Sequence, residues 1–223
     1  MQFEDKGGSD LQYIPAKTIV TRTKSSAWFG ARYNMNLYRG CPHGCIYCDS
    51  RSDCYRITDF DQVRAKANAL QIVRDDLRRK VLPGVIATGA MSDPYNPAEQ
   101  ELLLTRHALE LVSAYGFGVA IATKSTLITR DIDILQEIKS NAPVLAKITI
   151  TTPDDDLAGK IEPRAPSSSA RFACVKQLSE AGIFTGILLM PILPFLADKR
   201  ESILELVKRA GESGARFIYP MFG

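Results

Sequence analysis

Residues 38–48 read Tyr-Arg-Gly-Cys-Pro-His-Gly-Cys-Ile-Tyr-Cys and hold three of the five cysteines in the 223-residue chain. These are Cys41, Cys45 and Cys48, so the spacing is Cys-x3-Cys-x2-Cys. The intervening glycine and proline residues suit a short irregular loop, on which three thiolates can converge on one inorganic centre. Three thiolates leave a tetrahedral or cubane centre one ligand short. Such an open coordination position is typical of a reactive centre rather than a structural one.

Two structural uses of these cysteines are the alternatives. A zinc site could take the same three cysteines with His43 or Cys54 as its fourth ligand. We favour a cluster, because a structural zinc site usually has a second Cys-x2-Cys or Cys/His pair and this sequence has none. A disulfide framework is disfavoured by the odd cysteine count, by the length of the chain and by an N-terminus without a signal peptide pattern.

The cysteine spacing resembles that of radical S-adenosylmethionine (SAM) enzymes, which have an aromatic residue before the last cysteine, here Tyr47. The stretch Asn-Met-Asn-Leu-Tyr-Arg-Gly-Cys from Asn34 looks like the spore photoproduct lyase-like branch of that superfamily. The resemblance implies that the three cysteines hold three irons of a [4Fe-4S] cluster and that SAM chelates the fourth. It also implies reductive cleavage of SAM to a 5′-deoxyadenosyl radical, with an external one-electron reductant of the flavodoxin or ferredoxin type. We therefore name residues 40–48 the cluster loop.

Composition indicates a globular protein of one domain. A chain of this length with 45% hydrophobic residues can bury a full core. The net charge of +3 permits binding to nucleic acid but does not require it. The sequence has no apolar run of membrane-spanning length and no targeting pattern at the N-terminus. We therefore predict a cytoplasmic monomer without a membrane segment.

The rest of the chain repeats a short apolar run, polar residues at its end and an amphipathic helix. An extended lead-in is expected over residues 1–30. Strands are then predicted near residues 33–37, 85–88, 117–123, 144–151, 183–190 and 215–220. Helices are predicted over residues 59–80, from 96, from 129, over 167–181 and over 198–213.

This alternation favours right-handed βαβ units around a parallel sheet, which is the α/β class. The family resemblance implies a partial (β/α)6 barrel over residues 31–223, with the cluster loop after strand 1. The last predicted strand ends three residues before the last residue. Members of the resembled branch continue beyond this point, so we expect a longer full-length protein.

Ligands of parallel α/β folds gather at the C-terminal ends of the strands. Here those ends carry polar or backbone-exposing residues, so one composite site is expected independently of the family. The residues at these ends are Tyr47, 89–93, Lys124, Thr149 with Thr151, Glu162 with Arg164, and Met190 with Pro191.

The resemblance places SAM at this composite site. It implies that Ser92 contacts the cofactor and that Lys124 meets its carboxylate, which suits an ammonium point charge, although a lysine there could also be solvated. Thr149 or Thr151 would offer a hydroxyl to the ribose or carboxylate. The predicted SAM contacts are Tyr47, Ala90, Ser92, Asp93, Lys124, Thr149, Thr151 and Met190.

One departure from the branch pattern concerns the substrate. Spore photoproduct lyases place a hydrogen-donating cysteine in a Cys-Thr-Ser-Asp context, where this chain reads Ala90-Met91-Ser92-Asp93. The quenching step of that repair reaction lacks its thiol, so we predict a relative that acts on a different substrate. Cys174 falls in the apolar spacing of a helix and is predicted to be a core residue. Cys54 is predicted to lie in a loop, with an auxiliary ligand or hydrogen donor as its alternative.

Two other functions stay open from the sequence. A non-catalytic iron–sulfur carrier or sensor would need a fourth protein ligand, either His43 or Cys54. A nucleic-acid-directed repair enzyme or binder is suggested by a basic series in the first predicted helix. That series is Arg64, Lys66, Arg74, Arg78, Arg79 and Lys80.

Overall fold

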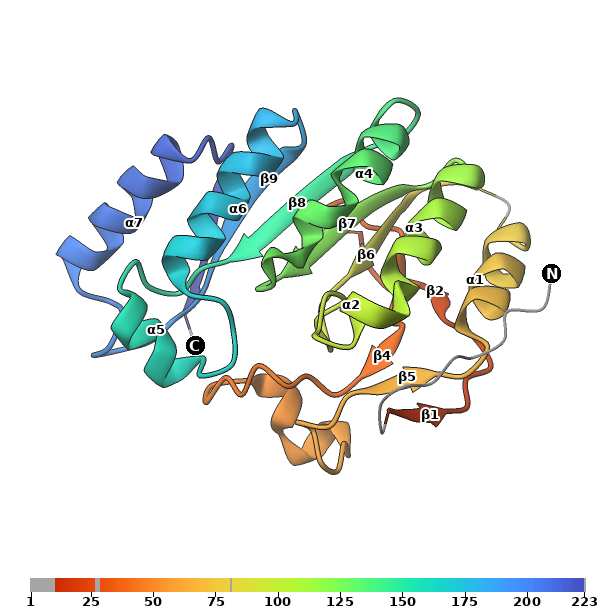
Figure 1. Ribbon diagram of the computed structural model, residues 1–223, viewed down its shortest axis with the longest axis horizontal. Helices are drawn as coiled ribbons and strands as arrows, with labels where there is room; N and C mark the ends of the chain where they lie inside the picture. Colours follow the sequence, from red (N-terminus) through yellow and green to blue (C-terminus); the bar gives the residue numbers. More distant parts are fainter. Residues whose placement is uncertain (1–10, 27–28, 81, 223) are drawn as a thin grey trace.

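The computed structural model describes residues 11–26, 29–80 and 82–222, and its fold is a curved parallel sheet covered by helices (Figure 1). Within these residues, the larger sheet has seven strands in the order β10-β9-β8-β7-β6-β3-β2. Every neighbouring pair from β10 to β3 is parallel, and β2 is antiparallel to β3. The six parallel strands are the six that the sequence predicts, which confirms the α/β class and the partial barrel.

The strands of the larger sheet are β2 (Val20–Arg22), β3 (Tyr33–Met35), β6 (Val85–Thr88), β7 (Gly118–Thr123), β8 (Val144–Thr149), β9 (Phe184–Ile192) and β10 (Ile218–Phe222). A smaller sheet has the order β1-β5-β4 and consists of β1 (Gln12–Ile14), β5 (Arg64–Lys66) and β4 (Tyr38–Arg39). The α-helices are α1 (Ala69–Arg78), α2 (Glu99–Leu102), α3 (Leu104–Ala114), α4 (Ile132–Lys139), α5 (Asp155–Ile161), α6 (Ser168–Glu180) and α7 (Arg200–Glu212). Short 3-10 turns are η1 (Asp49–Arg51), η2 (Asp53–Tyr55) and η3 (Thr126–Asp131).

The core lies between the sheet and the row of helices that crosses one of its faces (Figure 1). The central strand β7 is buried along nearly its whole length, as expected for a parallel strand with both faces covered. Val119 and Ile121 of β7 are completely buried, as are Leu109 of α3 and Leu135 of α4. No helix in the described ranges has the length and apolar character that crossing a membrane requires.

The predicted helix over residues 59–80 is wrong in its first half. Residues Arg64–Lys66 form β5, which pairs with β1 and β4, and α1 begins only at Ala69. Asn68 has a left-handed backbone (φ 54°) and separates the strand from the helix. Because the pairing partners of β5 are more than twenty residues away, the helical spacing alone could not reveal the strand. The basic series is consequently divided between β5 and α1.

Three further differences from the prediction concern a helix that is broken in two, a helix that was not predicted and two strands near the N-terminus. The helix predicted from residue 96 is broken at Leu103 (φ 52°) into α2 and α3. The loop after β8 contains α5, which the sequence analysis missed, although Asp154 accepts hydrogen bonds from the N–H groups of Asp156 and Leu157 as an N-cap. The predicted extended lead-in over residues 1–30 contains two strands, β1 in the smaller sheet and β2 in the larger one. Its residues 1–10 and 27–28 lie outside the described residues. The domain boundary at residue 30 stays a prediction.

Candidate active site

The cluster loop begins where β4 ends and is anchored at its start by two neighbouring segments. The Cys41 N–H donates to the Phe60 carbonyl at 2.8 Å, and the Ser92 hydroxyl donates to the Gly40 carbonyl. Figure 1 shows this loop lying across the C-terminal ends of the parallel strands. The local sequence therefore delivers the cysteines to the edge of the sheet where ligands are expected.

All three cysteines of the loop line one pocket, and all are free thiols. The pocket is completed by residues from the ends of β6, β7 and β8, which lie far apart in the sequence. Its lining includes Cys41, His43, Cys45, Tyr47, Cys48, Phe60, Gly89, Ala90, Met91, Ser92, Asp93, Ala122, Thr123, Lys124 and Thr149. The composite site expected from the strand ends thus exists as one cavity.

Six of the eight predicted SAM contacts line this pocket: Tyr47, Ala90, Ser92, Asp93, Lys124 and Thr149. The other two, Thr151 and Met190, are not among the described residues that line the pocket. The Thr151 hydroxyl donates instead to Glu162 Oε1 at 3.1 Å, and Met190 lies within β9. Of the two threonines, Thr149 therefore faces the pocket, while the contacts of all eight with SAM stay predictions.

The close approach of two strand ends shapes the pocket floor at Gly89. This residue has φ +95°, and a Cβ atom there would lie 1.8 Å from the Ala122 carbonyl oxygen. Only glycine can occupy such a position without moving the backbone of β7.

The donor set fits an iron–sulfur cluster. Burial raises the pKa of the Cys41 thiol to about 11, with a smaller contribution from the Asp93 carboxylate, and burial also raises the pKa of Cys45. A buried thiolate is costly on its own but is stabilised when it binds a metal centre. The three thiols around one cavity therefore suit the three protein-ligated irons of a [4Fe-4S] cluster.

The zinc alternative needs three or four ligands about a single point. Within the described part of the chain, no three His, Cys, Asp or Glu side chains have that arrangement. Cys54 is exposed, and its Sγ lies 2.9 Å from Ser52 Oγ. His43 is buried with Nδ1 3.6 Å from Asp93 Oδ2, and burial lowers its pKa while Asp93 opposes that shift. Both candidate fourth ligands of a zinc site thus have other partners, Ser52 for Cys54 and Asp93 for His43.

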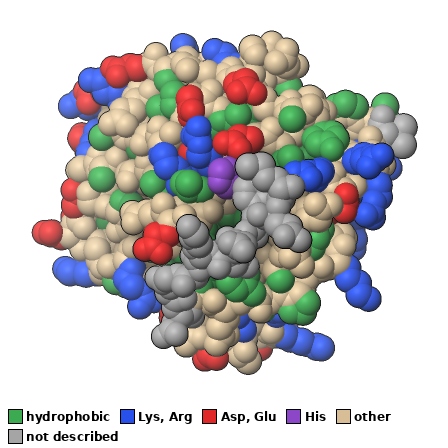
Figure 2. All heavy atoms as spheres, turned by 45° about the vertical axis from the view of Figure 1, so that its right-hand side comes forward, with side chains coloured by type: hydrophobic (Ala, Val, Ile, Leu, Met, Phe, Trp, Pro, Cys, Tyr) green, Lys and Arg blue, Asp and Glu red, His purple; other side chains and the backbone are tan. Residues whose placement is uncertain are grey.

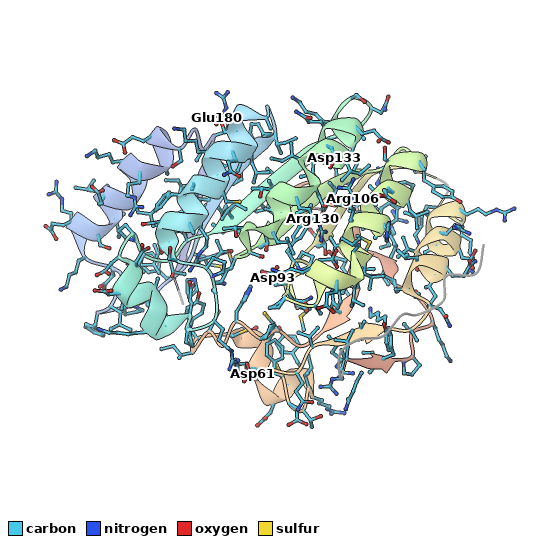
Figure 3. All side chains as sticks on the ribbon, viewed as in Figure 1. Asp61, Asp93, Arg106, Arg130, Asp133 and Glu180 are labelled. Atoms are coloured by element: carbon cyan, nitrogen blue, oxygen red, sulfur yellow. The ribbon has the colours of Figure 1, made fainter. Side chains whose placement is uncertain are left out.

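Asp93 holds the ends of β6 and β7 together at the pocket. Its Oδ1 accepts hydrogen bonds from the Thr123 hydroxyl at 2.6 Å and from the Tyr95 N–H at 2.9 Å. Its Oδ2 accepts the Lys124 N–H at 2.9 Å. Figure 3 shows Asp93 between the helices and the cluster loop. The carboxylate therefore fixes the backbone from which the Lys124 side chain enters the pocket.

Glu162 forms a second buried hub, whose role the sequence analysis did not find. It accepts hydrogen bonds from the Tyr47 hydroxyl, the Thr151 hydroxyl and the Arg171 guanidinium. Arg171 also donates to the Thr149 carbonyl at 2.9 Å. Burial would raise the pKa of Glu162, but Lys124, Arg171 and the Tyr47 hydrogen bond lower it below its ordinary value. The hub is thus an ionised carboxylate.

Lys124 stands beside this hub. Its Nζ lies 5.5 Å from the centroid of the Tyr47 ring. Its charge offsets part of the burial effect that raises the pKa of Cys45, and it helps to lower the pKa of Glu162. The pocket therefore combines three thiols with a cationic side chain and a hydroxyl from Thr149, which can together receive an amino acid carboxylate next to a metal centre.

Comparison with known proteins identifies the family. The family model of the radical SAM superfamily matches residues 35–211, which include the cluster loop and all the strand ends described above. The chain belongs to the radical SAM superfamily. Members of this superfamily bind a [4Fe-4S] cluster and SAM, which is the cofactor pair that the resemblance implies.

Two relatives of this radical SAM protein come from a bacterium and an archaeon. It is 31% identical over 215 residues to the uncharacterized protein Rv2578c of Mycobacterium tuberculosis, which covers 93% of this chain and 63% of the relative. It is 31% identical over 185 residues to the uncharacterized protein MJ0683 of Methanocaldococcus jannaschii, covering 83% and 68%. The chain thus spans about 63% of the length of the mycobacterial relative.

The fold of this radical SAM chain is similar to that of spore photoproduct lyase. A solved structure of that lyase, complexed with dinucleoside spore photoproduct, aligns with a TM-score of 0.63 and 17% identity. The alignment covers 88% of this chain and 57% of the lyase chain. The likeness confirms the fold expected from the resemblance.

Proposed function

We propose that this protein is an enzyme that cleaves SAM reductively, with Cys41, Cys45 and Cys48 as the cluster ligands. The observation that carries the proposal is the single pocket lined by these three free thiols and by the ends of three parallel strands. When bound, the reduced cluster and SAM together supply a 5′-deoxyadenosyl radical for hydrogen abstraction. The protein supplies ligation, orientation and exclusion of water.

Each pocket residue then has a stated task. The Lys124 ammonium binds the SAM carboxylate, and the Thr149 hydroxyl adds a hydrogen bond beside it. Asp93 orients Lys124 through its backbone N–H. The apolar side chains of Phe60 and Met91, with Ala90, wall the cavity and limit access of water to the reactive atoms.

The substrate is proposed to differ from that of spore photoproduct lyase, because Ala90 stands where the resemblance expects a hydrogen-donating thiol. An external reductant of the flavodoxin or ferredoxin type, a monomeric state and a cytoplasmic location remain proposals for the whole protein. One observation still favours the alternative function, an enzyme or binder directed at nucleic acid. Arg74, Arg78 and Arg79 are exposed, and Figure 2 shows Lys and Arg side chains at several places around the rim of the face it draws.

Replacing Lys124 by methionine is expected to raise the Kd for SAM roughly 10- to 100-fold. This ratio corresponds to the binding free energy that is usually lost with a hydrogen bond to a charged group. Equilibrium dialysis of SAM against the reconstituted protein measures the change. The matched control is Lys208→Met, because Lys208 is exposed on α7. Equal affinities in the two variants would contradict the assignment of Lys124.

The proposed function is tested by electron paramagnetic resonance of the anaerobically reconstituted and dithionite-reduced chain, with and without SAM. We expect a [4Fe-4S]+ signal whose shape changes when SAM is added, together with formation of 5′-deoxyadenosine. A signal indifferent to SAM would favour the electron carrier. Stoichiometric zinc without an iron–sulfur signal would overturn the reading of the three cysteines.

A further inference from the structure

The middle of the cluster loop is bound to the last residue of α5 and the residues after it, more than a hundred residues later in the chain. We name residues 161–164 the clamp segment. The Ile46 N–H donates to the Ile161 carbonyl at 3.0 Å, and the Arg164 N–H donates to the His43 carbonyl at 3.0 Å. These two bonds pair the backbones of the two segments on either side of Cys45.

Side chains of the clamp segment extend the same contact. The Arg164 guanidinium donates through Nε to the Pro42 carbonyl and through Nη2 to the Asp61 carboxylate. Glu162 accepts the hydrogen bond of the Tyr47 hydroxyl. The clamp segment therefore contacts residues that lie next to each of the three cysteines.

The packing between the two segments leaves little free space at Gly44. This residue has φ +72°, and a Cβ atom there would lie 3.1 Å from Arg164 Nη2 and 3.2 Å from Pro163 Cγ. The left-handed turn between the first two cysteines is thus formed directly against the clamp segment.

The loop makes few such bonds with itself. The Cys48 N–H donates to the Cys45 carbonyl at 3.3 Å, which closes a turn around the last two cysteines. Its first residues are held by Phe60 and Ser92, and its middle is held by the clamp segment. A loop rich in glycine has a high conformational entropy, so these outside partners determine where the thiols stand.

We propose that Arg164 and Glu162 are positioning residues of the cluster loop. Arg164 sets the path of the backbone between Cys41 and Cys45. Glu162 orients Tyr47 beside Cys48 and joins it, through Arg171, to the Thr149 carbonyl at the end of β8. The inference rests on the proposed function, because it takes the cysteines to be cluster ligands.

Arg164 gives the decisive test, since its side chain is 56% exposed and its removal leaves the core intact. In Arg164→Ala, the reconstituted cluster should be lost to a chelator about 10-fold faster than in the wild type, as for other partners that orient metal ligands. Loss is followed by the decay of the cluster absorbance. Unchanged far-ultraviolet circular dichroism shows that the chain still folds. The matched control is Lys160→Ala, which removes the same charge from an exposed position on α5.

Two further variants separate geometry from charge and test the Glu162 link. Arg164→Lys keeps the charge but not the planar fork, so it should lose the cluster faster than the wild type. Tyr47→Phe removes the hydroxyl that donates a hydrogen bond to Glu162, and it leaves the Glu162–Arg171 ion pair in place. It should raise the Kd for SAM about 10-fold and alter the resonance of the reduced cluster.

The outcomes are distinct. Cluster loss from Arg164→Ala or Arg164→Lys at the wild-type rate would overturn the role of Arg164. An unchanged SAM affinity and resonance in Tyr47→Phe would overturn the role of Glu162. A wild-type chain that takes up no iron–sulfur cluster would overturn the proposed function itself.

Discussion

Replacing any one of Cys41, Cys45 and Cys48 by alanine is expected to abolish both the [4Fe-4S] cluster and the formation of 5′-deoxyadenosine from SAM. The three thiols line one pocket, and a cluster that already keeps one iron free for SAM has no spare protein ligand. The measurement is iron and sulfide per chain after anaerobic reconstitution, followed by chromatography of the nucleoside product.

Cys54→Ala is the matched control for this series. Cys54 is exposed, and its Sγ contacts Ser52 rather than the pocket. We expect its iron content and product formation to equal those of the wild type. If Cys54→Ala lost its cluster, all four irons would have protein ligands, and the electron carrier would replace the enzyme as the better interpretation.

Replacing Glu162 by alanine is expected to lower the free energy of unfolding by about 3–5 kcal/mol, the usual cost of removing one partner of a buried ion pair. The side chains of Glu162 and Arg171 are 0% and 1% exposed, so the variant leaves the Arg171 charge inside the protein without its carboxylate. The Tyr47 and Thr151 hydroxyls lose an acceptor as well. Denaturation of the metal-free chain in urea measures the change.

Glu180→Ala provides the comparison. Glu180 Oε1 lies 3.9 Å from Lys176 Nζ in an exposed ion pair on α6. Exposed ion pairs contribute little to stability. Its unfolding midpoint should match the wild type. Similar midpoints for the Glu162 and Glu180 variants would show that the buried pair does not contribute as described.

Together these variants distinguish two layers of the site. The cysteines act on the cluster directly, whereas Glu162 acts through Tyr47, Thr151 and Arg171. Because the second layer consists of protein side chains alone, its contribution to stability can be measured by unfolding. The destabilisation expected for Glu162→Ala is also the reason that the positioning role is tested with Arg164 and Tyr47 instead.

Features that depend on near neighbours along the chain could be predicted from the sequence. The Cys-x3-Cys-x2-Cys spacing predicted the cluster loop, and the radical SAM family is confirmed by the match over residues 35–211. The alternation of apolar runs with amphipathic helices predicted six parallel strands. This was possible because hydrophobic periodicity is a property of residues that are neighbours in the sequence. The polar residues after those runs predicted a composite site, because parallel strands end at one edge of a sheet.

Which side chains contact one another could not be predicted in this way, because those contacts depend on tertiary packing. Residues 64–66 form a strand because β1 and β4 pair with them, which local spacing could not show. Thr149 rather than Thr151 lines the pocket, and the Thr151 hydroxyl donates to Glu162 instead. Tyr47 and Glu162 are 115 residues apart, and their contact exists only once α5 is packed against the cluster loop. Hydrogen bonds of this kind leave no periodic trace in the sequence, since each depends on the packing of elements that are distant along the chain.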